Sequence, residues 1–461
     1  MSSSEVIQTN EDVFEYLKDH KITFINLWFT DVLGQLKSFN IRESEIEGAL
    51  NEGMGFDGSS IEGFVRIEES DLVVKPIPST LKSLPYRPQD EDRVAGMFCE
   101  IRNPDGSRFE ADSFLVLERQ LERMKKLGFD HYYVGPELEF FLFKDNRPGD
   151  MSGKILDHGN YFGVADDAGV NVRREIILAC SKAGIQVEYS HHEVAPSQHE
   201  IDLRYGDALE MARNITFYRK LAKEIAKQHD SYLTFMPKPI YGENGNGMHV
   251  HQSLFKGEHN AFFDPDDEHH LSKISKHYIA GILRHAPEIA AITNQWVNSY
   301  QRLVPGYEAP TELSWARRNR SCAVRVPMYK PGKENATRIE VRFPDPACNF
   351  PLAFAVMLAA GLEGIEKEYE LAEAVETNIF EMDEKERVRR GVTVLPGNLK
   401  EATKLMKDSS FIRTVLGEHI FTSLVGNQED EWREYHLEVT GRDRKDHVVT
   451  QYEIEKLLPI L

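Results

Sequence analysis

The stretch from Tyr133 to Phe143, YVGPELEFFLF, constrains this chain most, because two acids stand in an aromatic and aliphatic run. In a strand, residues two apart point to the same face roughly 6.5 Å apart, so Glu137 and Glu139 face one place. Like charges there repel, and burying either one unpaired is costly. We expect a cation between them, and carboxylate oxygens suit Mg²⁺ or Mn²⁺. The alternative is a strand face exposed to solvent. A cation site is therefore favoured only if other strands of the chain also carry acids on one face.

The overall composition is that of a globular protein with 41% hydrophobic and 28% charged residues. Its 461 residues predict two or three domains. The net charge of −20 argues against a surface for nucleic acid or anionic lipid. No apolar run is long enough for a membrane helix, and the polar N-terminus lacks the pattern of a signal peptide. The four cysteines form no C-x-x-C pair, so a reducing cytoplasm fits best.

A strong turn signal, Asn103-Pro-Asp-Gly106, predicts a boundary between a domain over 12–105 and a domain over 111–461. The first domain should be small and mixed. It contains GFDGSSIEGF, where Asp57 is surrounded by Gly53, just before this motif, and by Gly55, Gly58 and Gly63 within it. Glycine density predicts a loop, and local sequence favours a turn or capping role for this aspartate over a functional one.

Two further strand regions of the second domain are rich in acids and histidines. VEYSHHEVAPSQHEIDL predicts a hairpin that bends near Pro196 and crowds together Glu188, His191, His192, Glu193, His199 and Glu200. GMHVHQSL predicts a strand with His249, His251 and Ser253 on one face. A lone strand histidine is more often a core residue, but two on one face behind a glycine-rich approach favour a site.

Arginines are concentrated in two segments of the same domain. WARRNRSCAVR supplies Arg317, Arg318, Arg320 and Arg325, which predict an anion site or, alternatively, surface ion pairs with nearby acids. ATRIEVRFPDP predicts a strand with Arg338, Glu340 and Arg342 on its polar face.

These strands predict an α+β fold, in which a curved, mostly antiparallel sheet carries a polar channel and helices pack behind it. Such a channel can hold two divalent ions and a polyanion, as phosphoryl transfer requires. No Walker-type loop occurs, so any ATP binds without a P-loop. Residue patterns alone leave the acceptor open.

The motifs GFDGSSIEGF, GPELEFFLF, HHEVAPSQHEI, NGNGMHVHQSL, NSYQRLVPGYEAP, RNRS and RIEVRFPDPACN resemble, in this order, those of type I glutamine synthetase. The resemblance spans nearly the whole chain. It implies a small β-grasp-like N-terminal domain, a large catalytic domain, and a homododecamer of two hexameric rings with inter-subunit sites. It also implies ATP-dependent ligation of ammonium to L-glutamate through a γ-glutamyl phosphate.

The resemblance assigns roles residue by residue. Two or more Mg²⁺ or Mn²⁺ ions would be held by one set comprising Glu139, Glu193 and Glu200 and a second comprising Glu137, His249 and Glu340. Nucleotide-binding positions are Glu188, His251, Ser253, Arg325 and Arg338. Glutamate-binding positions are Asn244, Gly245, Arg302 and Arg342.

Three further positions match catalytic residues of the family. Arg320 matches the arginine that stabilises the phosphoryl group in flight. Asp57, from the adjacent subunit, would bind ammonium and help remove its proton, and Glu308 lies on a flap over the intermediate. An acyl phosphate hydrolyses readily, so a lid that excludes water would protect it.

The chain also indicates how its activity is controlled. Where many bacterial members carry an adenylylated tyrosine, this sequence has Phe380, so we predict a non-adenylylated subtype. Finding AMP on that residue would contradict this. Arg66 resembles an arginine of a feedback-regulated subtype, and a pocket with Arg87, Arg173 and Arg174 is a regulatory hypothesis. Regulation by PII-like or other small proteins stays open.

Two alternatives remain at this point. A γ-glutamyl-polyamine or amine ligase shares the fold and metals, but Asp57 and the flap VPGYEAP favour the small cation ammonium. A non-catalytic ring assembly would have eroded metal ligands, whereas all six positions are filled here.

Overall fold

The computed structural model describes residues 7–59, 61, 63, 71–86, 93–145, 154–319, 321–377, 382, 384–439 and 448–461. Arg66, Arg87, Arg320 and Phe380 lie outside these ranges. What the sequence predicts for these four residues therefore stays a prediction.

The N-terminal part is a six-stranded sheet with two helices, as predicted for a small mixed domain. Its strands follow the order β2-β1-β6-β4-β3, with β5 on β6, and β1 runs parallel to β6. Contrary to the loop prediction, the start of GFDGSSIEGF belongs to β3, which pairs with β4. The elements are α1 (Asn10–Asp19), β1 (Ile22–Thr30), β2 (Leu36–Arg42), α2 (Ile46–Asn51), β3 (Met54–Asp57), β4 (Asp71–Pro76), β5 (Lys82–Ser83) and β6 (Arg93–Arg102).

The predicted turn after β6 is present, and its Gly106 N–H donates to the Asn103 carbonyl at 2.9 Å. Asp112 then caps helix α3 (Ser113–Lys126) by accepting the Phe114 N–H. Gly128 ends this helix with a positive φ of 83°.

The second sheet has eleven strands in the order β17-β14-β15-β16-β12-β7-β9-β8, with β10 and β11 on β7 and β13 on β12. Every pair in it is antiparallel except β14 with β15, so the predicted α+β fold with a mostly antiparallel sheet is confirmed. The strands are β7 (His131–Lys144), β8 (Val187–His192), β9 (Gln198–Leu203), β10 (Gly206–Asp207), β11 (Ser231–Thr234), β12 (Met248–Lys256), β13 (His259–Asn260), β14 (Glu312–Ala316), β15 (Cys322–Arg325), β16 (Ile339–Val341) and β17 (Thr393–Val394).

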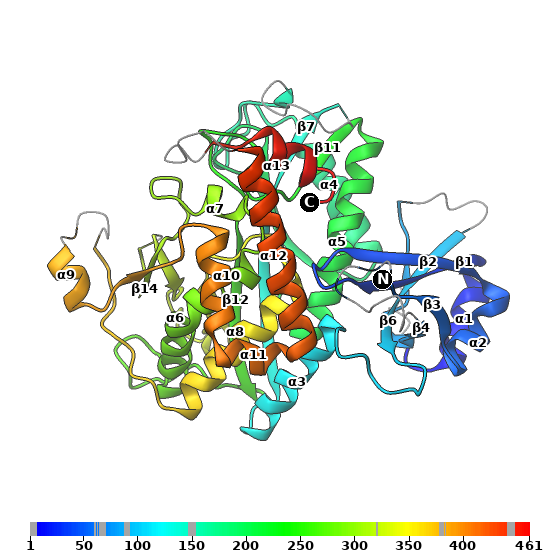
Figure 1. Ribbon diagram of the computed structural model, residues 1–461, viewed down its shortest axis with the longest axis horizontal. Coiled ribbons are helices and arrows are strands. Elements are labelled where there is room, and N and C mark those ends of the chain that lie inside the picture. The colour runs from blue at the N-terminus through cyan, green and yellow to red at the C-terminus, as the bar shows by residue number, and fades with distance from the viewer. Residues whose placement is uncertain are drawn as a thin grey trace.

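Helices cover this sheet, and among them α8, buried along most of its length, packs along α6 (Figure 1). The two helices can approach closely because Gly281 has no side chain. A Cβ there would lie 2.1 Å from the Ala360 carbonyl oxygen. No described helix has both the length and the hydropathy of a membrane span. The remaining helices are α4 (Val170–Lys182), α5 (Ala208–Gln228), α6 (Lys273–Thr293), α7 (Ser299–Arg302), α8 (Phe350–Glu366), α9 (Glu384–Arg389), α10 (Leu399–Asp408), α11 (Ser410–Leu416), α12 (Glu418–Glu438) and α13 (Gln451–Lys456).

The N-terminal sheet packs beside the catalytic part through buried contacts (Figure 1). The Trp28 and Phe217 rings lie 5.0 Å apart, and Arg219 donates to the Gly34 carbonyl at 2.7 Å. Gly96 leaves room for the indole, because a Cβ there would lie 2.1 Å from Trp28 ring atoms. These contacts fix the small sheet on α5.

Candidate active site

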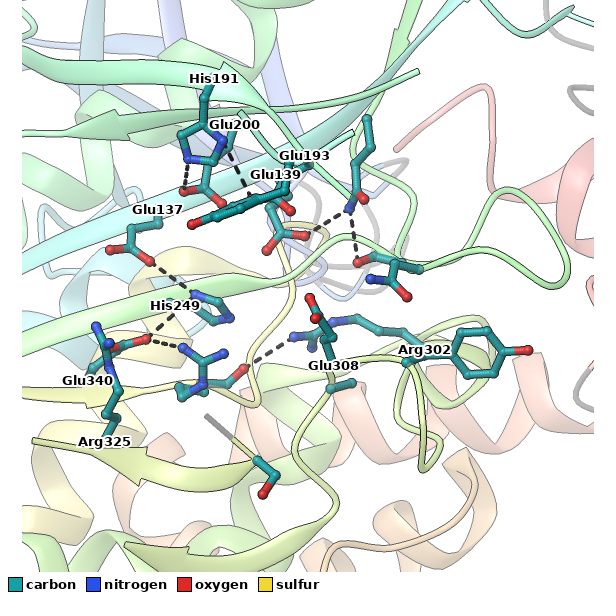
Figure 2. Close-up of a pocket in the computed structure, with 18 of the residues that line it drawn as sticks. Glu137, Glu139, His191, Glu193, Glu200, His249, Arg302, Glu308, Arg325 and Glu340 are labelled. Carbon is teal, nitrogen blue, oxygen red and sulfur yellow. Dashed lines mark hydrogen bonds and ion pairs between the residues drawn. The ribbon is translucent and has the colours of Figure 1, made fainter. Parts of the chain in front are cut away.

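The strands of the catalytic sheet enclose a cavity of about 460 Å³. All six residues that the resemblance assigns to metals line it, namely Glu137, Glu139, Glu193, Glu200, His249 and Glu340. Figure 2 shows these side chains converging from strands β7, β9, β12 and β16 and, for Glu193, from the turn after β8, with Arg302 and Arg325 beside them. The cavity therefore joins a carboxylate wall to a cationic one.

Strand pairing explains how this convergence arises. Glu137 of β7 lies opposite His249 of β12, and Glu139 of β7 lies opposite Glu200 of β9. Alternate residues of a strand share a face, so both glutamates point into the cavity while Leu138 is buried on the other side.

One compact group consists of Glu137, His249 and Glu340, whose potential ligand atoms lie within 4.8 Å of one another. The His249 Nδ1 lies 3.0 Å from a Glu137 oxygen and 3.7 Å from a Glu340 oxygen. Burial raises the pKa of Glu137, but His251 and His249 outweigh it and lower that pKa well below its usual value. Burial also acts on Glu340, yet Arg342 and both histidines bring its pKa to about 2. Both carboxylates are thus held as anions.

The other wall carries carboxylates that lack such compensation. Burial raises the pKa of Glu139 to about 7, although Arg302 opposes it. Burial and the neighbouring Glu139 raise the pKa of Glu193 to about 9. Burial, Asp202 and Glu139 raise the pKa of Glu200 well above its usual value. Oxygen donors crowded in this way fit a hard divalent cation, which would relieve their repulsion.

The compact group around Glu200 differs from the predicted set. Among the described residues, its potential ligand atoms group with those of His191 and Asp202 rather than with Glu139 and Glu193. The His191 Nδ1 lies 3.0 Å from the His192 carbonyl oxygen, which leaves Nε2 3.3 Å from a Glu200 oxygen. A ring nitrogen so oriented by a carbonyl is typical of metal ligands. His191 is part of the sequence His191-His192-Glu193, but the resemblance to the family does not assign it to a metal.

The cationic wall contains the predicted glutamate-binding residues Asn244, Gly245, Arg302 and Arg342. Arg302 is buried and donates to the Phe343 carbonyl at 2.8 Å, so it also fixes the turn after β16. Gly245 permits a close approach, because a Cβ there would lie 2.3 Å from the Pro237 carbonyl oxygen and 3.1 Å from Arg302 Cγ.

The predicted nucleotide-binding residues divide into two sets. Arg325 lines the cavity and pairs with Glu340. His251 lies next to the cavity, because its Nε2 is 2.7 Å from an oxygen of the lining residue Glu137. Its Nδ1 accepts the Arg338 Nε–H at 3.1 Å. Ser253 is buried farther along β12 and Glu188 is exposed on β8, and neither lines this cavity.

Two predicted catalytic residues lie in different places. Glu308 lines the cavity, adopts a positive φ of 56°, and its charge acts on Glu193. Asp57 is exposed at the end of β3, accepts the Ser59 N–H at 2.8 Å, and does not line the cavity of its own chain.

For one arginine of the predicted anion site, the alternative of a surface ion pair is correct. Arg317 pairs with Glu376 at 3.6 Å, and both its backbone N–H and that of Arg318 donate to the same carboxylate. These residues follow the end of β14, and neither of them lines the cavity. Only Arg325 of the four is a described residue that lines it.

The predicted regulatory pair also divides. Arg173 is buried, pairs with Asp167 at 2.6 Å and lies 2.7 Å from His199 Nδ1. Arg174 is exposed and donates to Asn171 at 3.3 Å. A buried ion pair gives Arg173 a structural role in this chain.

The sequence analysis assigned no site role to several lining residues, namely Tyr161, Tyr189, His191, Gln198, Tyr307 and Ser321. Gln198 donates to a Glu139 oxygen at 2.9 Å and to the Gly245 carbonyl at 3.2 Å, which joins the two walls. Its position two residues before Glu200 was the available signal, because both then share a strand face.

Comparisons with protein families cover most of the chain. Residues 21–104 match the family model described as "Glutamine synthetase, beta-Grasp domain", and residues 110–447 match "Glutamine synthetase, catalytic domain".

Individual proteins agree with these matches. A protein named glutamine synthetase from Mycolicibacterium smegmatis is 50% identical over 440 residues, covering 95% of this chain and 98% of that protein. One from Methanosarcina mazei is 48% identical over 428 residues, covering 93% and 95%. A structure titled "GmaS/ADP complex-Conformation 1" matches with a TM-score of 0.82 and 27% identity, covering 97% of this chain and 99% of the other. The Plasmodium falciparum glutamine synthetase structure gives 0.83 and 25%, covering 97% and 98%.

Proposed function

The chain belongs to the glutamine synthetase family, and from this premise we propose which of its residues carry each step of the reaction. The reaction is the ATP-dependent ligation of ammonia to L-glutamate, which yields L-glutamine, ADP and phosphate. The proposal rests on one observation: acids and a histidine from four strands and one turn line a single cavity together with Arg302, Arg325 and Arg342.

We infer two cation positions in the cavity. Glu137, His249 and Glu340 would hold one, and Glu139, Glu193 and Glu200 would hold the other. Bound Mg²⁺ or Mn²⁺ would act as a Lewis acid toward the phosphates and the substrate carboxylate. The crowding that raises the pKa values of the second set supports this assignment.

Two substrate subsites follow from the cationic wall. Arg302, Arg342, Asn244 and Gly245 would bind glutamate, since guanidinium groups fork onto carboxylates. The nucleotide would be bound by Glu188, His251, Ser253, Arg325 and Arg338. The similarity to a structure titled as an ADP complex supports a nucleotide subsite in this fold.

The residues then act on two successive bonds. A γ-carboxylate oxygen of glutamate attacks the γ-phosphorus of ATP, which releases ADP and gives γ-glutamyl phosphate. Arg320 and Arg325 would stabilise the negative charge spread over the transferred group. Ammonia next forms the C–N bond, and phosphate leaves. Asp57 and Glu308 would accept the ammonium proton, because only the neutral amine is a nucleophile.

We propose that Asp57 acts in the site of a neighbouring subunit of a homododecamer built from two hexameric rings. Its exposure at the end of β3, away from the cavity of its own chain, supports this arrangement. We place the protein in the cytoplasm, in keeping with four buried cysteines that form no disulfide.

ADP formation with glutamate, measured with and without ammonium, tests the function. We expect ammonium to raise it strongly and putrescine or spermine not to replace ammonium. Faster turnover with either amine would instead support an amine ligase. The mass of the native assembly tests the ring proposal, and a monomer would contradict it.

A further inference from the structure

Lys238 is a buried lysine between the glutamate-side loop, residues 241–247, and the flap, residues 304–309. Only 2% of it is exposed. The reaction proposed above gives Lys238 no role. Asn244 of the loop and Tyr307 of the flap, the two segments on either side of Lys238, both line the cavity.

The backbone of Lys238 is fixed on both sides by one amide. Its N–H donates to Asn298 Oδ1 at 2.7 Å, and Asn298 Nδ2 donates back to its carbonyl at 3.0 Å. Asn298 also donates to Glu453 of α13 at 2.8 Å. The stem of the side chain therefore starts from a rigid point.

The charged amino group of the Lys238 side chain contacts both the glutamate-side loop and the flap. Lys238 Nζ donates to the Glu243 carbonyl and lies 3.8 Å from the centroid of the Tyr307 ring. A desolvated ammonium over an aromatic face is attracted by the ring quadrupole more strongly than an exposed one. Burial lowers the pKa of Lys238 to about 8, with Glu243 opposing and Arg302 adding to the effect, so it is mostly charged at neutral pH.

Val304 and Ala309 are buried at the two ends of the flap, but the stretch between them has few buried side chains. Pro305, Gly306 and Glu308 are exposed, and Gly306 and Glu308 both have positive φ. Tyr307 is half-buried between them, so its ring is the part of the exposed stretch that contacts the protein body.

We propose that Lys238 is a positioning residue that holds Tyr307, and thereby the flap, over the acyl phosphate. This inference rests on the proposed function. With the flap loosened, water attacks γ-glutamyl phosphate in place of ammonia, which returns glutamate and releases phosphate. The net result is ATP hydrolysis without glutamine.

The experiment measures ADP formed per glutamine formed at saturating ammonium. Wild type should form one ADP per glutamine. Lys238→Met, which keeps the stem but removes the charge, and Tyr307→Leu should each raise the ratio about twofold or more. The double variant should raise it no further, because both changes break one contact. Lys238→Arg and Tyr307→Phe, which keep a cation and a ring face, should stay close to wild type.

A matched control is Lys220→Met, since Lys220 Nζ lies 5.9 Å from the Tyr86 ring, outside the cavity. Its ratio should not change. If Lys238→Met lowers kcat or stability with an unchanged ratio, or if its effect multiplies with that of Tyr307→Leu, the positioning role is wrong. Absence of ammonium-dependent ADP formation in wild type would instead refute the proposed function, so the two failures are distinguishable.

Discussion

Replacing Glu340 by Gln tests whether one buried carboxylate holds the arginine side of the cavity together. This side chain is fully buried, accepts hydrogen bonds from Arg325 and Arg342, and lies 3.7 Å from His249 Nδ1. The glutamine side chain has nearly the same shape, but it would leave the guanidinium of Arg342 buried without its anion.

The pKa of Glu340 gives the magnitude. Its ordinary value is 4.5 and its value in the folded chain is about 2, a difference that corresponds to about 3 kcal/mol. Breaking other buried ion pairs costs about 3–5 kcal/mol, which agrees. Because the folded pKa lies below the unfolded one, this stabilisation is fully present above about pH 5 and is lost as the pH falls toward 2.

Urea unfolding at neutral pH and equal subunit concentration measures the effect. We expect Glu340→Gln to lower the free energy of unfolding by about 3 kcal/mol. The control is Glu386→Gln on α9, whose pKa is also lowered to about 2, by Arg389 and Arg390, but at the surface. Exposed ion pairs contribute little, so the control should unfold like wild type. Equal unfolding midpoints for the two variants would refute the reasoning.

Three further tests, each with a pair of variants, address other parts of the structure. Enzymes made only of Asp57→Asn subunits or only of Glu139→Gln subunits should each be inactive. Coexpressing the two subunits should restore about a quarter of the sites, because a site with an intact Glu139 can then receive an intact Asp57 from its neighbour. No recovery of activity in enzyme assays would contradict this. Gly96→Ala should destabilise by about 1–3 kcal/mol because its Cβ would meet Trp28, whereas Gly55→Ala, with nothing within 4 Å, should not; thermal unfolding compares them. Arg173→Met should destabilise by about 3 kcal/mol by leaving Asp167 unpaired, whereas Arg174→Met should not, and equal denaturation curves would be inconsistent with the buried pair.

The parts of the site that sequence could predict are those set by local periodicity. Alternation along YVGPELEFFLF placed Glu137 and Glu139 on one face, and alternation in GMHVHQSL did the same for His249 and His251. A period of two needs no knowledge of neighbouring strands. The turn at Asn103–Gly106 and the α3 cap are local in the same sense.

The parts that sequence could not predict depend on register and on long-range packing. Nothing local states that Glu139 lies opposite Glu200, or that Glu200 groups with His191 and Asp202. Arg317 looked equivalent to Arg325, but the end of β14 turns it toward Glu376. Lys238 carried no signal, because its partners Tyr307 and Asn298 lie far along the chain.

Anomalous diffraction from Mn²⁺-soaked crystals of the assembly tests the central claim most directly. Our account predicts two Mn²⁺ peaks per subunit in one cavity, one among Glu137, His249 and Glu340 and one among Glu139, Glu193 and Glu200. Peaks at another group, such as the buried Asp157, His192 and His199, with none in the cavity, would contradict it.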